Sequence, residues 1–301
     1  MEDSMRHGQR ISHGRFIALL VAAALVAGCG RGFIPEPPYE ATAIPEDVTD
    51  LFVLFGDEDS ETVWVLEQGG PSHMLEDLGN LSEVFRNYSD FGEVQLALVH
   101  QTLTLNHDLA PRHAEFSLAE LQAEVDVSVE ILHRTIEHFR DQGKRVVVIG
   151  HSYGAFLTAR YLWQKGPAAA DRFLIMAGRL DMPEEVVNGF LMGTLYYFPD
   201  GVTPTALPPF PVPPTDQELM EMRIAGATGH DRYTERLADT DLRRVIYVYG
   251  TQDFIVGRLT DDEVGFLESG GATVIAIQGG SHTSMFEDVA AAQEISDALQ
   301  E

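Results

Sequence analysis

The stretch Val146–Phe156, which reads VVVIGHSYGAF, decides the fold that the sequence predicts. It begins as an apolar, β-branched run, passes through a serine with a glycine two positions away on each side, and continues as a helix-forming segment to about Lys165. This pattern predicts a buried strand, a sharp turn that carries Ser152, and a helix. Gly150 and Gly154 suit such a turn, because backbones pass close together there and a Cβ atom would clash.

The sequence around this stretch alternates short β-rich runs with helical segments. Several runs are almost entirely apolar, which is typical of parallel strands covered on both faces. The clearest helix begins at the capping box Ser117–Glu120 and ends near Gly143. Strand, helix and strand in succession predict an α/β fold with a mostly parallel sheet flanked by helices. The predicted strands are Leu51–Phe55, Thr62–Leu66, Val94–Val99, Arg145–Ile149, Phe173–Met176, Val245–Tyr249 and Ala272–Ile277.

One region, residues 181–243, breaks this alternation. It is rich in proline and also contains apolar and aromatic residues such as Phe190 and Tyr196. A structureless loop of that length is uncommon inside a folded domain, so we expect an inserted cap with two or three short helices. Surface decoration is the alternative.

Two further strand ends supply what a reactive Ser152 requires, because a serine hydroxyl is a weak nucleophile without a base beside it. The run Val245–Tyr249 leads into Asp253, and the run Ala272–Ile277 leads into His282. The carboxyl ends of parallel strands meet at one edge of a sheet, so the three side chains can converge. His282 would take the proton from Ser152, and Asp253 would orient the imidazole.

Each of these assignments has an alternative. Asp253 can be a turn aspartate that bonds its own backbone, and His282 can be a neighbour of the final helix N-terminus. Asp181 follows another predicted strand and is a second candidate for the acid. We prefer Asp253, since apolar residues follow it and Asp181 stands at the entrance to the irregular insertion.

The developing oxyanion needs two donors. The backbone N–H of Tyr153, at the start of the helix, is one candidate. The stretch Gln68–Pro71, which reads QGGP, can present another through Gly70, where no side chain hinders close approach. A plain turn is the alternative interpretation of this stretch.

Together these motifs make the sequence resemble an α/β-hydrolase-fold serine hydrolase, from about Leu51 to the C-terminus. The resemblance implies an eight-stranded, mostly parallel sheet with the cap inserted after the sixth strand. It also implies Ser152 as nucleophile, Asp253 as acid, His282 as base, and Gly70 with Tyr153 as oxyanion donors. The QGGP loop is similar to the HGGP loop of iminopeptidase-like members. However, glutamine replaces the histidine, and the sequence after the third strand reads HQT where those members have Asp-x-Arg-Gly.

The N-terminus predicts a secretory signal. Three arginines precede an apolar run, Phe16–Ala27, that is too short to span a bilayer. Small residues then stand before Cys29, the one cysteine of the chain, in a pattern that resembles a bacterial lipobox. We therefore expect residues 1–28 to be a lipoprotein signal peptide, residues 29–50 a lipidated cysteine and proline-rich tether, and residues 51–301 the hydrolase domain. An ordinary secreted protein, with its only cysteine at the cleavage site by chance, is the alternative.

The formal net charge of −27, from 20 basic and 47 acidic residues, argues against nucleic acid as a partner, because such a surface repels phosphates. The sequence thus predicts an extracytoplasmic serine hydrolase, anchored to the membrane through Cys29, that cleaves an ester or similar acyl bond in a small-molecule substrate. We expect it to need no cofactor and no metal. An aminopeptidase or amidase of the same fold is one alternative, and a lipoprotein that only binds a ligand is another.

Overall fold

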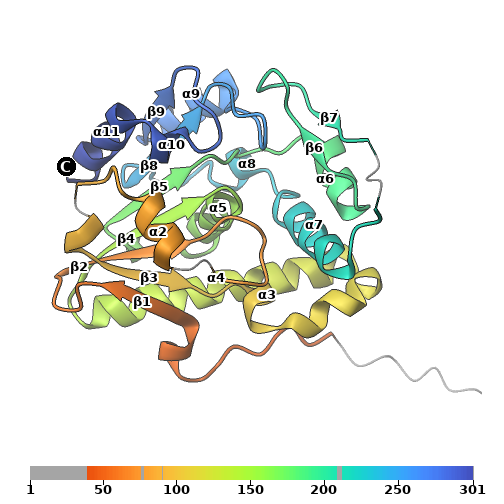
Figure 1. Cartoon of the computed structure of the whole chain (residues 1–301), viewed down its shortest axis with the longest axis horizontal. Coiled ribbons are helices and arrows are strands. Elements are labelled where there is room, and N and C mark those ends of the chain that lie inside the picture. Colours follow the sequence, from red (N-terminus) through yellow and green to blue (C-terminus); the bar gives the residue numbers. More distant parts are fainter. Residues whose placement is uncertain (1–38, 76–77, 90, 209–211, 301) are drawn as a thin grey trace, which may run out of the picture. The chain divides into compact units, whose positions relative to one another are not determined.

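Seven strands form the central sheet, in the order β1-β3-β2-β4-β5-β8-β9 (Figure 1). The edge strand β1 pairs antiparallel with β3, and the other neighbours pair in parallel. Each strand lies at one of the β-rich runs that the sequence analysis identified. The bounds are β1 Phe52–Gly56, β2 Thr62–Glu67, β3 Gln95–Val99, β4 Arg145–His151, β5 Arg172–Met176, β8 Val245–Gly250 and β9 Thr273–Ile277.

Helices lie in the connections between the sheet strands from β2 onward and after β9. The structure, a computed structural model, describes residues 39–75, 78–89, 91–208 and 212–300. The helices are α2 Leu78–Val84, α3 Thr102–Leu105, α4 Leu118–Asp141, α5 Tyr153–Lys165, α6 Glu184–Leu191, α7 Asp216–Thr228, α8 Tyr233–Arg236, α9 Asp261–Ser269, α10 Ser284–Glu287 and α11 Val289–Gln300.

The long helix α4 begins and ends where the sequence predicts. The Ser117 hydroxyl accepts from the backbone N–H of Glu120, and the Glu120 carboxylate accepts from the N–H of Ser117 at 2.7 Å. This capping box satisfies two N–H groups that have no partner within the helix. Just beyond the other end, Gly143 has a φ of +80°, a left-handed conformation that suits a residue without a side chain.

The sheet is covered on both faces, as its apolar strands require. Helices α4 and α5 contact each other and the strands β2 and β4. A cluster of buried apolar residues also includes Trp64 and Ile149 from the strands together with Met285 and Ile295 from α10 and α11. A fully buried aliphatic side chain contributes about 1.5–3 kcal/mol. This packing on both faces therefore holds the strand ends, which carry the candidate site residues, in fixed positions.

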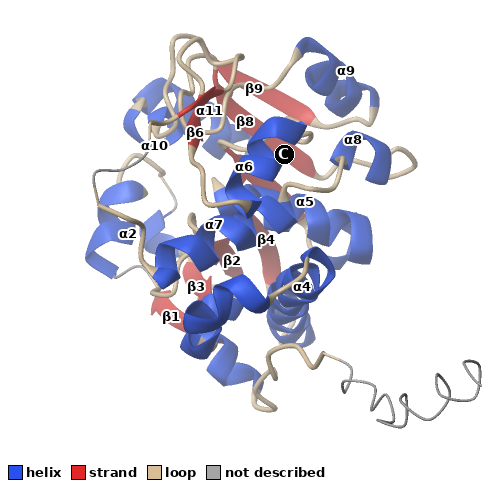
Figure 2. Ribbon diagram, turned by 90° about the vertical axis from the view of Figure 1, so that its right-hand side faces the viewer, coloured by secondary structure: helices blue, strands red, loops and turns tan. Residues whose placement is uncertain are grey.

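The chain between β5 and β8 forms the predicted insertion, or cap, with the helices α6, α7 and α8. It also contains a two-stranded antiparallel pair, β6 Tyr196–Tyr197 and β7 Thr205–Ala206, that the sequence analysis did not predict. Figure 1 shows α6, α7, β6 and β7 together on the right, and in Figure 2 the helices α6 and α7 lie in front of the sheet. The implied eight-stranded sheet with a cap after the sixth strand is wrong for the described residues: the sheet has seven strands, and the cap follows the fifth.

The compact unit that contains the sheet includes residues from Ala41 onward. The N–H of Thr42 donates to Glu124 on α4 at 3.0 Å, and the Arg134 guanidinium donates to the Pro45 carbonyl at 2.7 Å. The predicted signal peptide and Cys29 lie outside the described residues. Among the helices that are described, none combines the length and the apolar character needed to cross a membrane.

Candidate active site

Ser152 stands at a strained turn between β4 and α5. Its φ of 56° and ψ of −116° lie outside the ordinary strand and helix regions, which is rare for a residue with a side chain. The flanking glycines explain how the turn fits. A Cβ atom on Gly150 would lie 2.3 Å from the Thr158 hydroxyl, and one on Gly154 would lie 2.1 Å from the Glu67 carbonyl oxygen. The strained turn is thus maintained by close backbone contacts with helix α5 and strand β2.

Asp253 and His282, which are far apart in the sequence, are hydrogen-bonded to each other. Nδ1 of His282 lies 2.7 Å from Oδ2 of Asp253, and the two residues are only 6% and 1% exposed. The other carboxylate oxygen of Asp253 accepts from the backbone N–H groups of Ile255 and Val256. Because an ionised carboxylate can only accept, Nδ1 of His282 is the donor, and its Nε2 is left as an acceptor.

The strained turn at Gly150–Gly154, which we call the elbow, is joined to His282 by contacts of His151. Its Nε2 lies 3.3 Å from the His282 carbonyl oxygen, and the two rings are 5.1 Å apart between centroids. Burial lowers the pKa of His151 to about 4, so this imidazole is neutral near neutral pH. Within the described residues no hydrogen bond joins the Ser152 hydroxyl to His282. In enzymes without substrate such bonds are often long and tighten on binding.

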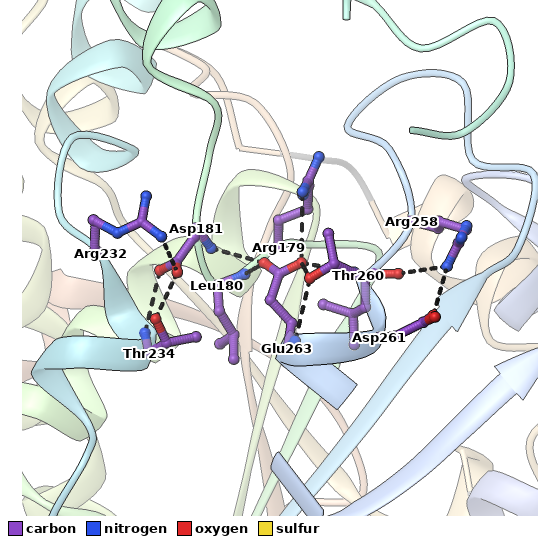
Figure 3. A network of polar contacts seen from close by, with 10 residues as sticks. Arg179, Leu180, Asp181, Arg232, Thr234, Arg258, Thr260, Asp261 and Glu263 are labelled. Carbon is purple, nitrogen blue, oxygen red and sulfur yellow. Dashed lines mark hydrogen bonds and ion pairs between the residues drawn. The ribbon is translucent and has the colours of Figure 1, made fainter. Parts of the chain in front are cut away.

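The competing acid, Asp181, is engaged elsewhere (Figure 3). Its carboxylate accepts from the Thr234 hydroxyl at 2.5 Å and from the Arg232 guanidinium at 2.8 Å. Its backbone N–H donates to Glu263, which also caps helix α9 through Thr260. These bonds fasten the start of the cap to α8 and α9.

Gly70 and Tyr153, the candidate oxyanion donors, border the same cavity as Ser152. Tyr153 is the first residue of α5, where an N–H has no carbonyl partner one turn earlier in the helix. Gly70 has a φ of +128°, so a side chain at this position would be strained. A Cβ atom added to Gly69 would lie 3.5 Å from the Ser152 Cβ, so the loop packs directly on the elbow.

A cavity of about 930 Å³ opens between the elbow and the cap. Its lining comes from the loop after β2, the elbow, the cap and the segment after Asp253, and is largely apolar. Its volume and character are typical of a site for a small apolar molecule. Among the described residues, no cluster of three or more metal-ligating side chains is present.

A pair of polar side chains behind the elbow was missed by the sequence analysis. Glu67, the last residue of β2, is fully buried, and neither of its carboxyl oxygens has a hydrogen-bond partner among the described residues. Gln101 donates to the Gln68 carbonyl at 3.0 Å, while its own amide oxygen is buried without a partner. Burial raises the pKa of Glu67 well above its usual value, although the Gln101 side chain opposes the shift. The signal in the sequence was an acid that ends the apolar run TVWVLE.

Comparison with known proteins agrees with this architecture. The model of the Alpha/beta hydrolase family matches residues 69–298, which include the elbow, the cap, Asp253 and His282. The chain therefore belongs to the alpha/beta hydrolase family. A search of curated protein sequences found no match.

Solved structures show the same fold at low sequence identity. One is MGS-M2, an alpha/beta hydrolase enzyme from a Medee basin deep-sea metagenome library, with 12% identity and a TM-score of 0.50 over 83% of this chain and 94% of that chain. Another comes from work on LipS and LipT, two metagenome-derived lipolytic enzymes, with 11% identity and a TM-score of 0.50 over 82% of this chain and 97% of that chain. At these identities the likeness concerns the fold alone.

Proposed function

We propose that this protein is a serine hydrolase that cleaves an ester or similar acyl bond through an acyl-enzyme at Ser152. The proposal rests on one observation. The buried Asp253–His282 pair lies at the same edge of the sheet as the strained Ser152, and Ser152 borders an apolar cavity. The elbow exposes the hydroxyl, and the tautomer of His282 leaves Nε2 free to accept its proton.

In the first half of the reaction, Ser152 Oγ attacks the substrate carbonyl carbon while its proton passes to His282 Nε2. The carbonyl oxygen becomes an oxyanion that accepts hydrogen bonds from the N–H groups of Gly70 and Tyr153. Collapse of this intermediate breaks the bond to the leaving group, which takes the proton from His282. Asp253 keeps the imidazole oriented and stabilises its charged form.

In the second half, a water molecule attacks the acyl carbon and gives its proton to His282. Collapse then breaks the bond to Ser152 Oγ, which recovers the proton, and the carboxylic acid leaves. These steps use side chains and backbone N–H groups of the protein together with the substrate and water.

We further propose that the protein works outside the cytoplasm, attached to a membrane through a lipid on Cys29. This part rests on the N-terminal sequence pattern. A single acyl chain gives only marginal membrane binding, so stable attachment would require more than one chain on this residue.

Two assays test the enzymatic proposal. A fluorophosphonate probe, which reacts with activated serines, distinguishes an enzyme from a lipoprotein that only binds. A panel of p-nitrophenyl esters beside aminoacyl anilides distinguishes esterase from aminopeptidase chemistry. We expect labelling together with turnover of esters, whereas turnover of the anilides alone would favour the peptidase alternative.

A further inference from the structure

The charge distribution of the cavity is one-sided. Among the described residues of its lining, the charged side chains are Glu218 and Glu221, both on α7, and no lysine, arginine or histidine belongs to it. The remaining wall is dominated by apolar and aromatic residues from the cap and the elbow, such as Val187, Phe190 and Met222. A ligand in this cavity therefore meets apolar surface and negative charge, and no cation within the described wall that would pair with an anionic group.

The two carboxylates have different surroundings. Glu218 accepts from the N–H and the hydroxyl of Thr215, at 2.7 and 2.9 Å, so it caps the start of α7. Glu221 is about one quarter exposed, and its Oε1 lies 2.6 Å from Nδ1 of His73. Burial raises the pKa of Glu221, because the apolar surroundings disfavour its charged form. A second negative charge in the same surroundings would be repelled more strongly than in water.

Glu221 and the contact with Tyr153 lie at different places along helix α7. Near the end of this helix, the Thr228 hydroxyl lies 3.4 Å from the hydroxyl of Tyr153, the residue next to Ser152. Glu221 lies two helical turns earlier, roughly 10 Å along the helix axis at 1.5 Å per residue. It borders the same cavity as Ser152.

The acyl part of a substrate is the part that would occupy this cavity. The leaving group must lie beside His282, which returns the proton to it, and His282 is not among the described residues of the cavity wall. Ser152, Gly70 and Tyr153 do belong to that wall. The carbonyl group held by these three residues would thus direct its acyl chain under the cap.

We propose that the substrates are esters of medium or long, apolar carboxylic acids, and that Glu221 excludes acyl chains that end in a carboxylate. This inference rests on the proposed acyl-enzyme chemistry at Ser152. Glu221 acts in it as a specificity-determining residue without a role in bond cleavage.

The test compares kcat/KM of the full-length protein for three p-nitrophenyl esters: the butanoate, the octanoate, and the monoester of octanedioic acid, which is the octanoate with a carboxylate at its far end. Octanoate has a longer acyl chain than butanoate, and each methylene that it adds should raise kcat/KM by up to about fourfold when it is buried. The terminal carboxylate should lower kcat/KM by at least about tenfold relative to octanoate, because it meets Glu221 in apolar surroundings.

Glu221→Gln removes the charge and keeps an amide that can bond to His73. It should narrow the difference in kcat/KM between octanoate and its carboxylate analogue by about tenfold, chiefly by raising kcat/KM for the analogue. Glu235→Gln, on the exposed surface of α8, is the matched control and should leave the gap unchanged. Thermal melts of both variants establish that they are folded.

The outcomes separate this inference from the function on which it rests. Equal turnover of octanoate and its carboxylate analogue by the wild-type protein would overturn the inference, with ester hydrolysis intact. A wild-type gap that persists in folded Glu221→Gln would overturn the role of Glu221. No turnover of any ester, together with no fluorophosphonate labelling, would instead refute the proposed function.

Discussion

Nδ1 of His282 lies 2.7 Å from Oδ2 of Asp253, while Asp181, the other candidate acid, is bonded to Thr234 and Arg232. The two aspartates therefore have different expected roles: one orients an imidazole, and the other fastens the cap to its neighbours. Burial makes this distinction sharper, since Asp253 is 1% exposed and its second oxygen is held by two backbone N–H groups.

We expect Asp253→Asn to lower kcat for a p-nitrophenyl ester by roughly 10⁴, because the amide would favour the wrong tautomer of His282, as in a well-studied protease triad. Asp181→Asn is the matched control and should change kcat little. Circular dichroism establishes that each variant is folded. A folded Asp253→Asn protein with near-normal turnover would show that another residue acts as the acid of the triad.

Ser152→Ala should abolish fluorophosphonate labelling and lower ester turnover by roughly 10⁴- to 10⁶-fold, since only binding and oxyanion stabilisation would remain. Ser269→Ala, at the exposed end of α9, provides the control and should be labelled like the wild type. Gel fluorescence and a single-turnover assay measure the two effects. Labelling that persists in Ser152→Ala would place the nucleophile at another residue.

The strands and the elbow were predictable because local chemistry determines them. A β-branched, apolar run such as Val146–Ile149 has few alternatives to a buried strand, and the glycines around Ser152 leave no room for side chains. The edge of the sheet to which Asp253 and His282 belong followed from the parallel topology alone. Their bond required the tertiary structure, because 29 residues separate them.

The cap was predictable only in outline, because local chemistry does not determine its structure. Its length and proline content indicated an insertion, but the pairing of Tyr196–Tyr197 with Thr205–Ala206 depends on contacts that no local pattern reveals. Glu221 was missed in the same way. On α7 it has the sequence context of a surface residue, and its place in the cavity wall beside His73 arises from how the cap folds over the elbow.

The lipid anchor has its own test. Cys29→Ser should prevent the incorporation of radiolabelled palmitate and leave the precursor uncut, because the acylated thiol is lost. Val26→Leu, which brings the sequence nearer to the common lipobox pattern, should keep the labelling and serves as the control. Palmitate incorporation that survives Cys29→Ser would rule out this attachment site.

The last prediction concerns Glu67, whose buried carboxyl has no hydrogen-bond partner among the described residues. Burial raises its pKa in the folded protein well above the usual value of 4.5, so the folded state holds this proton more tightly than the unfolded state. The free energy of unfolding should therefore contain a contribution that is fully present below about pH 4.5 and is lost as the pH rises toward the folded-state pKa. The slope of this loss is at most about 1.4 kcal/mol per pH unit for one proton.

Glu67→Gln removes the titrating group and keeps nearly the same shape, with an amide that can donate to the buried oxygen of Gln101. Its free energy of unfolding should exceed that of the wild type by a margin that grows between about pH 5 and about pH 8, by up to about 1.4 kcal/mol per pH unit. Urea titrations at both pH values measure the margin. Glu61→Gln, exposed at the residue before β2, is the control and should show no such growth. If the free energies of unfolding of Glu67→Gln and the wild type changed with pH in parallel, Glu67 would be equally easy to ionise in the folded and unfolded states. A compensating donor would then reach its carboxylate in the folded protein.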